Sequence, residues 1–246
     1  MNALDDFISH FAGYGHLGAP LWFVGMEEGG GRSGAELQCR VEAWDARGRR
    51  ALEDLAGFHH AIGEAKYFRA PYPLQRTWTS LGRALQTWRG ESTDIASLQQ
   101  VQATVLGADN GLASLVELLP LPSPDTQAWP YSALADEHPH LADRKHYKSA
   151  YVGPRTDMLR GLVRKAKPRA VIFYGLAYLK FWSAISGRPL NRTQIAGQTC
   201  YVGQMGSPYF IATPHPTAHG MTKLFWEGIG THARALAGPT QIAPAT

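Results

Sequence analysis

Blocks of apolar residues alternate along the chain with segments in which apolar and polar positions are mixed, and each kind of block predicts a different element. Short apolar runs that end at a glycine or a proline-containing turn are typical of buried strands. We expect such strands at residues 21–24, 113–119, 170–174 and 209–212, with a further one at 198–203. Apolar residues spaced by three or four positions predict helices at 36–58, 78–88, 156–167, 176–186 and 224–236, the third of them capped by Thr156.

Strands that alternate with helices predict a three-layer α/β/α fold with a mainly parallel, four- to five-stranded central sheet. We expect one domain over residues 1–238 and a C-terminal tail at 239–246. Ligands of such folds bind beyond the carboxyl ends of the strands. The loops GMEEGGG, PLPSP, GLA and TPHPTAHG follow the four main strands. These loops are therefore expected to meet at one edge of the sheet.

The composition narrows the class of protein. The 246 residues are 44% hydrophobic and 18% charged, with a formal net charge of +4, which is typical of a globular chain. No apolar stretch approaches the roughly 20 residues of a membrane span, and the N-terminus is acidic where a signal peptide is basic. We therefore expect a cytoplasmic protein without a membrane partner. The two cysteines, Cys39 and Cys200, form no CxxC pair, which argues against a cysteine-built zinc site or an iron–sulfur cluster. No cofactor is expected.

The first loop places two carboxylates among glycines. Gly25 and the glycines at 29–31 permit close approach of a ligand to the backbone. Glu27 or Glu28 is suited to position a water or to stabilise a developing positive charge. The loop is not a phosphate loop, because it lacks the GK[ST] ending. The alternative is a solvated turn.

The fourth loop holds a histidine between two prolines. The prolines restrict the backbone around His215, which helps to aim an imidazole, and His219 lies four residues further on. His215 is suited to donate a hydrogen bond to a leaving group. The alternative is a polar turn residue with no function.

Two other polar segments have competing interpretations. Neither the histidines at 59–60, nor those at 138 and 140 with their neighbouring aspartates, nor those at 215 and 219 match a known metal motif. No metal is therefore expected, and EHPHLAD is interpreted as a polar surface loop. Residues 144–169 carry nine Lys and Arg against Asp157 alone. They predict either a solvated helix face or a phosphate-contacting edge that includes Arg155.

Taken in order, the four loops resemble those of the uracil-DNA glycosylase superfamily. The first motif of that family has forms such as GQDPYH, GEAPG and GMNPG, and here it reads GMEEG. The last motif is HPS, and here His215 begins HPT. The resemblance covers roughly residues 21–236. It implies a DNA glycosylase that hydrolyses the N-glycosidic bond of a flipped-out damaged or deaminated base, with single- or double-stranded DNA as its partner.

The resemblance also implies roles for the first and last loops. Gly25 and Met26 match the start of the first motif, and Glu27 falls where a water-positioning acid lies in several branches. Glu28 occupies the place of the usual proline. His215 is expected to hydrogen-bond the base carbonyl and to stabilise the departing anion, and Thr217 keeps the hydroxyl of the motif serine.

The second strand departs from the family pattern. Glu117 stands where the family often has an asparagine that reads the uracil edge. An ionised carboxylate only accepts hydrogen bonds, so it is expected to suit a base that presents N–H groups rather than uracil O4. Tyr67 or Phe68 is expected to stack on the base, and His219 and Lys223 are expected to contact the substrate and DNA.

Two alternatives to a glycosylase remain open. The first is a nucleic-acid- or nucleotide-binding protein with the same fold and no catalysis, which the unusual Glu28 and Glu117 favour. The second is an unrelated small-molecule hydrolase that uses Glu27 and His215. DNA binding that weakens with salt is expected only for the glycosylase and the binding protein.

Overall fold

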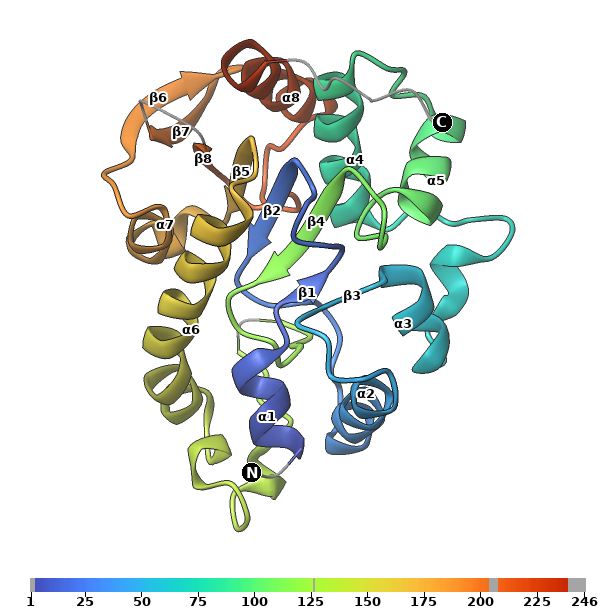
Figure 1. The fold of residues 1–246 in the computed structure, drawn as a ribbon, viewed down its shortest axis with the longest axis vertical. Helices are drawn as coiled ribbons and strands as arrows, with labels where there is room; N and C mark the ends of the chain where they lie inside the picture. The colour runs from blue at the N-terminus through green and yellow to red at the C-terminus, as the bar shows by residue number, and fades with distance from the viewer. Residues whose placement is uncertain (1–2, 126, 204–207, 239–246) are drawn as a thin grey trace.

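A sheet of eight strands lies at the centre of the protein, in the order β3-β1-β4-β2-β5-β8-β7-β6 (Figure 1). The computed structural model describes residues 3–125, 127–203 and 208–238. The strands are β1 (Gly13–Tyr14), β2 (Leu21–Gly25), β3 (Leu52–Glu53), β4 (Ala113–Glu117), β5 (Ala170–Tyr174), β6 (Asn191–Ile195), β7 (Gln198–Gly203) and β8 (Tyr209–Thr213).

The α/β class is confirmed, but the sheet is wider and more mixed than the sequence predicts. The four central strands β4, β2, β5 and β8 are parallel, as expected. β1 and β7 add antiparallel to them on the two sides. β6 pairs with β7 through a two-residue hairpin at Ala196 and Gly197, where φ is 47° and 77°. Positive φ at both central residues is the geometry that joins antiparallel strands tightly.

Eight α-helices and four short 3₁₀ helices are found in the described part of the chain. The α-helices are α1 (Ala3–His10), α2 (Gly34–Ala46), α3 (Leu55–Ala61), α4 (Arg76–Arg89), α5 (Ile95–Thr104), α6 (Arg144–Ala166), α7 (Leu179–Ser186) and α8 (Lys223–Ala237). The 3₁₀ helices are η1 (Ala65–Phe68), η2 (Ser132–Leu134), η3 (Pro139–Leu141) and η4 (Leu176–Tyr178).

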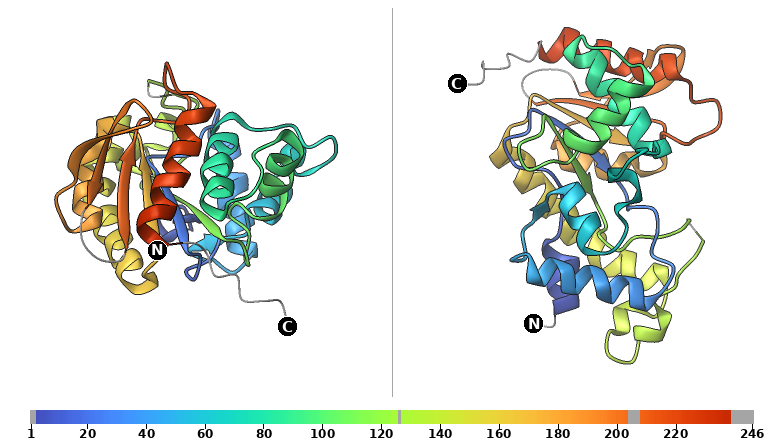
Figure 2. Two further views of the ribbon diagram at one scale, coloured as in Figure 1. Left: turned by 90° about the horizontal axis from the view of Figure 1, so that it is seen from above. Right: turned by 90° about the vertical axis from the view of Figure 1, so that its right-hand side faces the viewer.

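Helices cover both faces of the sheet (Figures 1 and 2). On one face Phe173 of β5 stacks on Trp182 of α7, with ring centroids 5.2 Å apart. On the other face Tyr14 of β1 packs on Phe58 of α3, at 5.7 Å. α8 packs against α4. None of the helices described is both long and apolar enough to cross a membrane.

The predicted helix at 36–58 is wrong as a single element. α2 ends at Ala46, and the chain then turns through Gly48 and Arg49, whose φ values are 89° and 55°. A helix cannot continue through consecutive left-handed residues. The chain therefore forms β3 before the next helix begins.

The predicted start of the helix at Thr156 is also wrong. α6 begins at Arg144, where the Asp143 side chain accepts a hydrogen bond from the backbone N–H of His146 at 2.8 Å. Pro154 lies inside this helix, and the Thr156 hydroxyl donates to the Val152 carbonyl at 2.6 Å. The predicted tail at 239–246 lies outside the described residues.

Candidate functional site

The carboxyl ends of the central strands bring a glutamate and a tyrosine together over a glycine. Gly25 at the end of β2 pairs with Glu117 at the end of β4. The hydroxyl of Tyr174, at the end of β5, donates a hydrogen bond to Glu117 Oε1 at 2.8 Å. A Cβ at Gly25 would overlap the Tyr174 hydroxyl and Glu117 Oε2. Gly25 is therefore required for these two side chains to meet.

Glu117 is a neutral acid near pH 7. Its side chain is buried, and burial raises its pKa from an ordinary value of 4.5 to about 8. The negative charge of Glu28 raises it further, while the hydrogen bond from Tyr174 and the charge of Arg155 oppose the shift. Oε2 has no hydrogen-bond partner among the described residues. This pKa favours the neutral form, whereas an ionised Glu117 was expected from the sequence, and a neutral carboxyl group can donate as well as accept.

Glu28, by contrast, is held as an anion. Arg40 of α2 donates to both of its carboxylate oxygens, at 3.0 and 3.3 Å, and the Tyr14 hydroxyl donates at 2.7 Å. His59 Nε2 lies 3.3 Å from Oε1. Burial alone raises the pKa of Glu28, but the Arg40 charge and the hydrogen bonds outweigh burial and leave the pKa well below its usual range.

Aromatic rings pack around His59. The ring centroids of Phe68 and Trp78 each lie 5.5 Å from that of His59. Tyr67 packs edge-on against Trp78, also at 5.5 Å. Phe68 is buried and Tyr67 is half-buried. Both predicted stacking residues therefore belong to the group of rings that reaches Glu28 through His59.

Glu27 faces a different partner. Its Oε1 accepts a hydrogen bond from Arg144, the first residue of α6. The same guanidinium donates to Ser123 Oγ at 2.8 Å and to the Ala128 carbonyl at 3.1 Å. Glu27 is thereby tied to the loop that follows β4, whereas Glu28 adjoins Glu117. No contact between Glu27 and His215 is recorded in the described part of the chain.

His215 joins the site through Tyr174. The two rings are arranged edge to face with centroids 5.6 Å apart. The backbone N–H of Thr217 donates to His215 Nδ1 at 3.3 Å. A backbone N–H only donates, so Nδ1 is the acceptor and the proton of the neutral ring lies on Nε2. His215 is exposed, and its partial desolvation lowers its pKa from 6.5, which favours the neutral ring. Nε2 is then a hydrogen-bond donor toward a ligand.

The remaining predicted site residues occupy different environments. Arg155 is only 1% exposed, and its guanidinium donates to the backbone carbonyls of Glu117 and Leu118, both at 2.9 Å. Arg155 therefore supports β4 from inside, and its predicted contact with DNA is wrong. Met26 is buried in the core. The other three predicted residues are exposed: Thr217, His219 and Lys223.

A basic hollow lies between α6 and α7, with a volume of about 520 Å³. Lys148 lies over the ring of Tyr178 at 5.3 Å, and Lys180 lies over the ring of Phe181 at 4.7 Å. Burial lowers the pKa of Lys148, and the positive charges of Arg144 and Lys180 lower it further. Arg144 is also the partner of Glu27. The hollow therefore carries positive charge, and Arg144 lies one helical turn before Lys148 on α6.

Sequence reasoning missed five residues of this site: Tyr14, Arg40, His59, Arg144 and Tyr174. Tyr174 had a signal, because it is the last residue of a predicted strand, and ligands of such folds bind beyond the carboxyl ends of the strands. Tyr14, Arg40 and His59 come from β1, α2 and α3 and converge only in three dimensions. Arg144 lies in the predicted basic segment, but nothing in the sequence pairs it with Glu27.

Comparisons with known proteins add no assignment, since no family model and no curated protein matches the chain.

Proposed function

We propose that the protein is a DNA glycosylase-like hydrolase that cleaves the N-glycosidic bond of a flipped-out damaged or deaminated base. One observation carries the proposal: Glu117, Tyr174 and His215 form a continuous chain of contacts along the carboxyl edge of the sheet. A neutral carboxyl group stands at one end and a neutral imidazole at the other. Both groups suit a base edge that presents donors and acceptors.

The proposed chemistry assigns one group to each developing charge. Departure of the base leaves positive charge on the sugar and negative charge on the base. His215 Nε2–H opposes the charge on the base. A carboxylate of the first loop, Glu27 as predicted or the ionised Glu28, opposes the charge on the sugar. Glu117 recognises the base by donating and accepting, as an amide would.

The basic hollow supports a nucleic-acid substrate. Lys148 and Lys180 provide positive charge, and Tyr178 and Phe181 provide rings beside it. Such a combination suits a sugar–phosphate backbone and unstacked bases. In the proposal this hollow replaces Arg155 as the DNA-contacting region, together with the exposed Lys223.

A second candidate is a nucleic-acid-binding protein without catalysis. The observation that favours it is the ion pair between Glu27 and Arg144. A carboxylate held by a guanidinium is a weaker base toward water, and a second acid, Glu28, is held by Arg40. Under this proposal both acids maintain the shape of the first loop.

The decisive experiment measures base release. The protein is incubated with single- and double-stranded oligonucleotides that carry uracil, hypoxanthine, xanthine or an alkylated base, and alkali-labile breaks are counted. We expect His215→Gln to slow release about 10²–10³-fold, the cost of removing one donor to a developing anion. His232→Gln is the matched control, because His232 is a half-buried histidine on α8 that contacts Tyr209.

Each other outcome selects a different conclusion. Salt-sensitive DNA binding without base release would reject the glycosylase and support the binding protein. Absence of both would reject the two nucleic-acid proposals and leave the small-molecule hydrolase. If base release is found, comparing its rate in Glu27→Gln and Glu28→Gln identifies which acid stabilises the positive charge on the sugar.

A further inference from the structure

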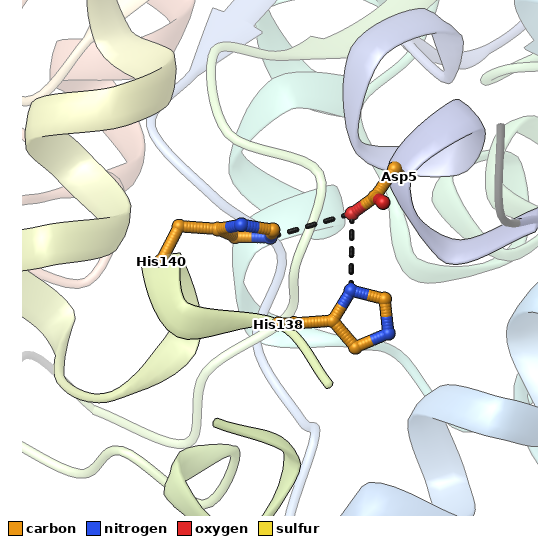
Figure 3. A group of neighbouring side chains, drawn as sticks. All are labelled: Asp5, His138 and His140. Atoms are coloured by element: carbon orange, nitrogen blue, oxygen red, sulfur yellow. Dashed lines mark hydrogen bonds and ion pairs between the residues drawn. The ribbon is translucent and has the colours of Figure 1, made fainter. Parts of the chain in front are cut away.

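Two histidines from one turn converge on an aspartate that is distant in the sequence (Figure 3). His138 precedes η3 and His140 lies within it, while Asp5 belongs to α1. Asp5 Oδ1 lies 3.1 Å from His138 Nδ1 and 3.4 Å from His140 Nε2. The sequence predicted a polar surface loop here, but His138 is only 5% exposed. The prediction is wrong at His138 because the turn packs onto α1.

The spacing of the three atoms matches a coordination site. Zn²⁺ binds imidazole nitrogen and carboxylate oxygen at about 2.0–2.2 Å, so two ligands of a tetrahedral ion lie about 3.3 Å apart. The two measured separations, 3.1 and 3.4 Å, bracket that value. One ligand atom from each of the three residues lies within 4.8 Å of the other two. Small movements of the side chains would therefore bring all three atoms to bonding distance of one ion.

The donor types indicate which ions fit. Two imidazoles and one carboxylate suit borderline transition-metal ions such as Zn²⁺, whereas Mg²⁺ and Ca²⁺ prefer all-oxygen sites. Three protein ligands leave one position of a tetrahedral ion for water. The hydroxyl of Tyr151, on α6, lies 3.2 Å from His140 Nε2. An ion would take over that nitrogen and release the hydroxyl to bond the water.

We propose that Asp5, His138 and His140 form a binding site for a divalent transition-metal ion of the Zn²⁺ class. The ion would join α1 to the turn that precedes α6, two segments separated by more than half of the chain. Arg155 of α6 also donates to the Ser9 carbonyl of α1, at 3.4 Å. The ion would reinforce an existing connection between these helices. The proposal stands on this cluster alone and does not depend on the proposed function.

The competing explanation is a hydrogen-bonded cluster with no affinity for metal. In that case the two imidazole N–H groups simply donate to Asp5. Asp5→Asn separates the explanations, because the amide oxygen still accepts hydrogen bonds but loses the negative charge that a metal ion requires. His140→Gln removes one nitrogen ligand at a position that is only half-buried.

The test is calorimetric titration of the tag-free, chelator-treated chain with ZnCl₂. We expect one ion to bind per chain. Asp5→Asn and His140→Gln should each weaken the affinity for Zn²⁺ by more than about 10–100-fold, the loss that follows removal of a residue that only contacts a metal ligand. Zn²⁺ should also raise the melting temperature of the unsubstituted chain more than that of either variant. Thermal melting in the absence of metal verifies that each variant folds. If one variant fails to fold, the affinity of the other variant for Zn²⁺ decides the test.

The matched control is His146→Gln. His146 is an exposed histidine whose Nδ1 lies 2.9 Å from Asp143 Oδ2, so it forms a histidine–carboxylate pair outside the cluster. Its affinity for Zn²⁺ should equal that of the unsubstituted chain. The proposal is overturned by the absence of saturable binding, by unchanged affinity in Asp5→Asn and His140→Gln, or by loss of affinity in His146→Gln.

Discussion

Glu28 and Glu117 are neighbouring carboxyl groups at the same edge of the sheet, yet at pH 7 Glu28 is ionised and Glu117 is protonated. Desolvation raises the pKa of both groups. Glu28 overcomes desolvation through Arg40, Tyr14 and His59, and it is an anion. Glu117 has the neutral Tyr174 hydroxyl as its hydrogen-bond donor, and its pKa rises to about 8. The partner, more than the depth of burial, therefore decides whether a buried acid is charged.

The difference assigns separate chemistry to the two acids. Titratable groups whose pKa values are driven apart often act as acid and base in one site. The anion suits a developing positive charge, and the neutral acid suits hydrogen bonding to a polar edge. The charge of Glu28 also helps to keep Glu117 protonated, because two adjacent anions repel. The two residues thus form one electrostatic unit.

A large loss of stability is expected from removing the cation. In Arg40→Met, Glu28 keeps Tyr14 and His59 but loses its charge partner. Removing one partner of a buried ion pair costs about 3–5 kcal/mol of unfolding free energy. Because the hydrogen bonds from Tyr14 and His59 remain, we expect a loss of about 3 kcal/mol. Urea unfolding at pH 7, followed by tryptophan fluorescence, measures the loss.

Arg49→Met is the control for Arg40→Met. Arg49→Met removes the exposed arginine that pairs with Asp6 and Asp45. Solvent screens such pairs, so a much smaller loss is expected. The loss in Arg40→Met should also shrink toward pH 4, as the unpaired Glu28 takes up a proton. Equal losses in both variants would contradict a charged, buried Glu28.

The next prediction concerns the opposite pH dependence of the two acids. Between pH 4.5 and about 8, the folded protein keeps a proton on Glu117 that the unfolded chain has already released. Relative to Glu117→Gln, the unsubstituted protein should therefore lose stability across this window, by at most about 1.4 kcal/mol per pH unit. Relative to Glu28→Gln, it should gain stability as the pH rises toward 4.5 and remain level above that.

Unfolding free energies measured from pH 2.5 to pH 9 give both curves. The two difference curves should bend in opposite directions and in separate pH ranges. A flat Glu117→Gln curve between pH 5 and pH 8 would mean that Glu117 is ionised in the folded protein. The assignment of Glu117 as a donor to a substrate would then fail.

Sequence patterns predicted the centre of the fold better than its edges. β2, β4, β5 and β8 are buried apolar runs with clear stops, and these strands were expected. β1 and β3 have two residues each, too few for a pattern, and β6 is the polar run NRTQI, whose residues are mostly exposed. The helical spacing of apolar residues continues across Gly48, so the turn at this residue was not predicted. Thr156 was interpreted as the cap of α6, although it lies inside that helix and its hydroxyl donates to the Val152 carbonyl.

The candidate site divides in the same way. The gathering of the loops followed from one rule, that the carboxyl ends of parallel strands meet, and the family resemblance singled out Glu117 and His215. Their protonation states did not follow, because desolvation depends on atoms from distant segments. Glu28 had no explanation in the sequence because its partners Tyr14, Arg40 and His59 are spread over three elements. Order along the chain identified the loops, and only the three-dimensional contacts identified their partners.

The smallest expected effect tests which way the Glu117 hydrogen bond runs. Tyr174→Phe removes a hydroxyl that lies 2.8 Å from Glu117 Oε1, at a cost of about 1 kcal/mol. The hydroxyl donates and so favours the ionised form, which lowers the pKa of Glu117. Its removal should extend the falling segment of the pH–stability curve above pH 8. Tyr209→Phe, which loses a contact with His232, should leave that segment unchanged. A shift to lower pH would instead mean that protonated Glu117 donates to Tyr174, and its proton would then be engaged by Tyr174 rather than available to a base.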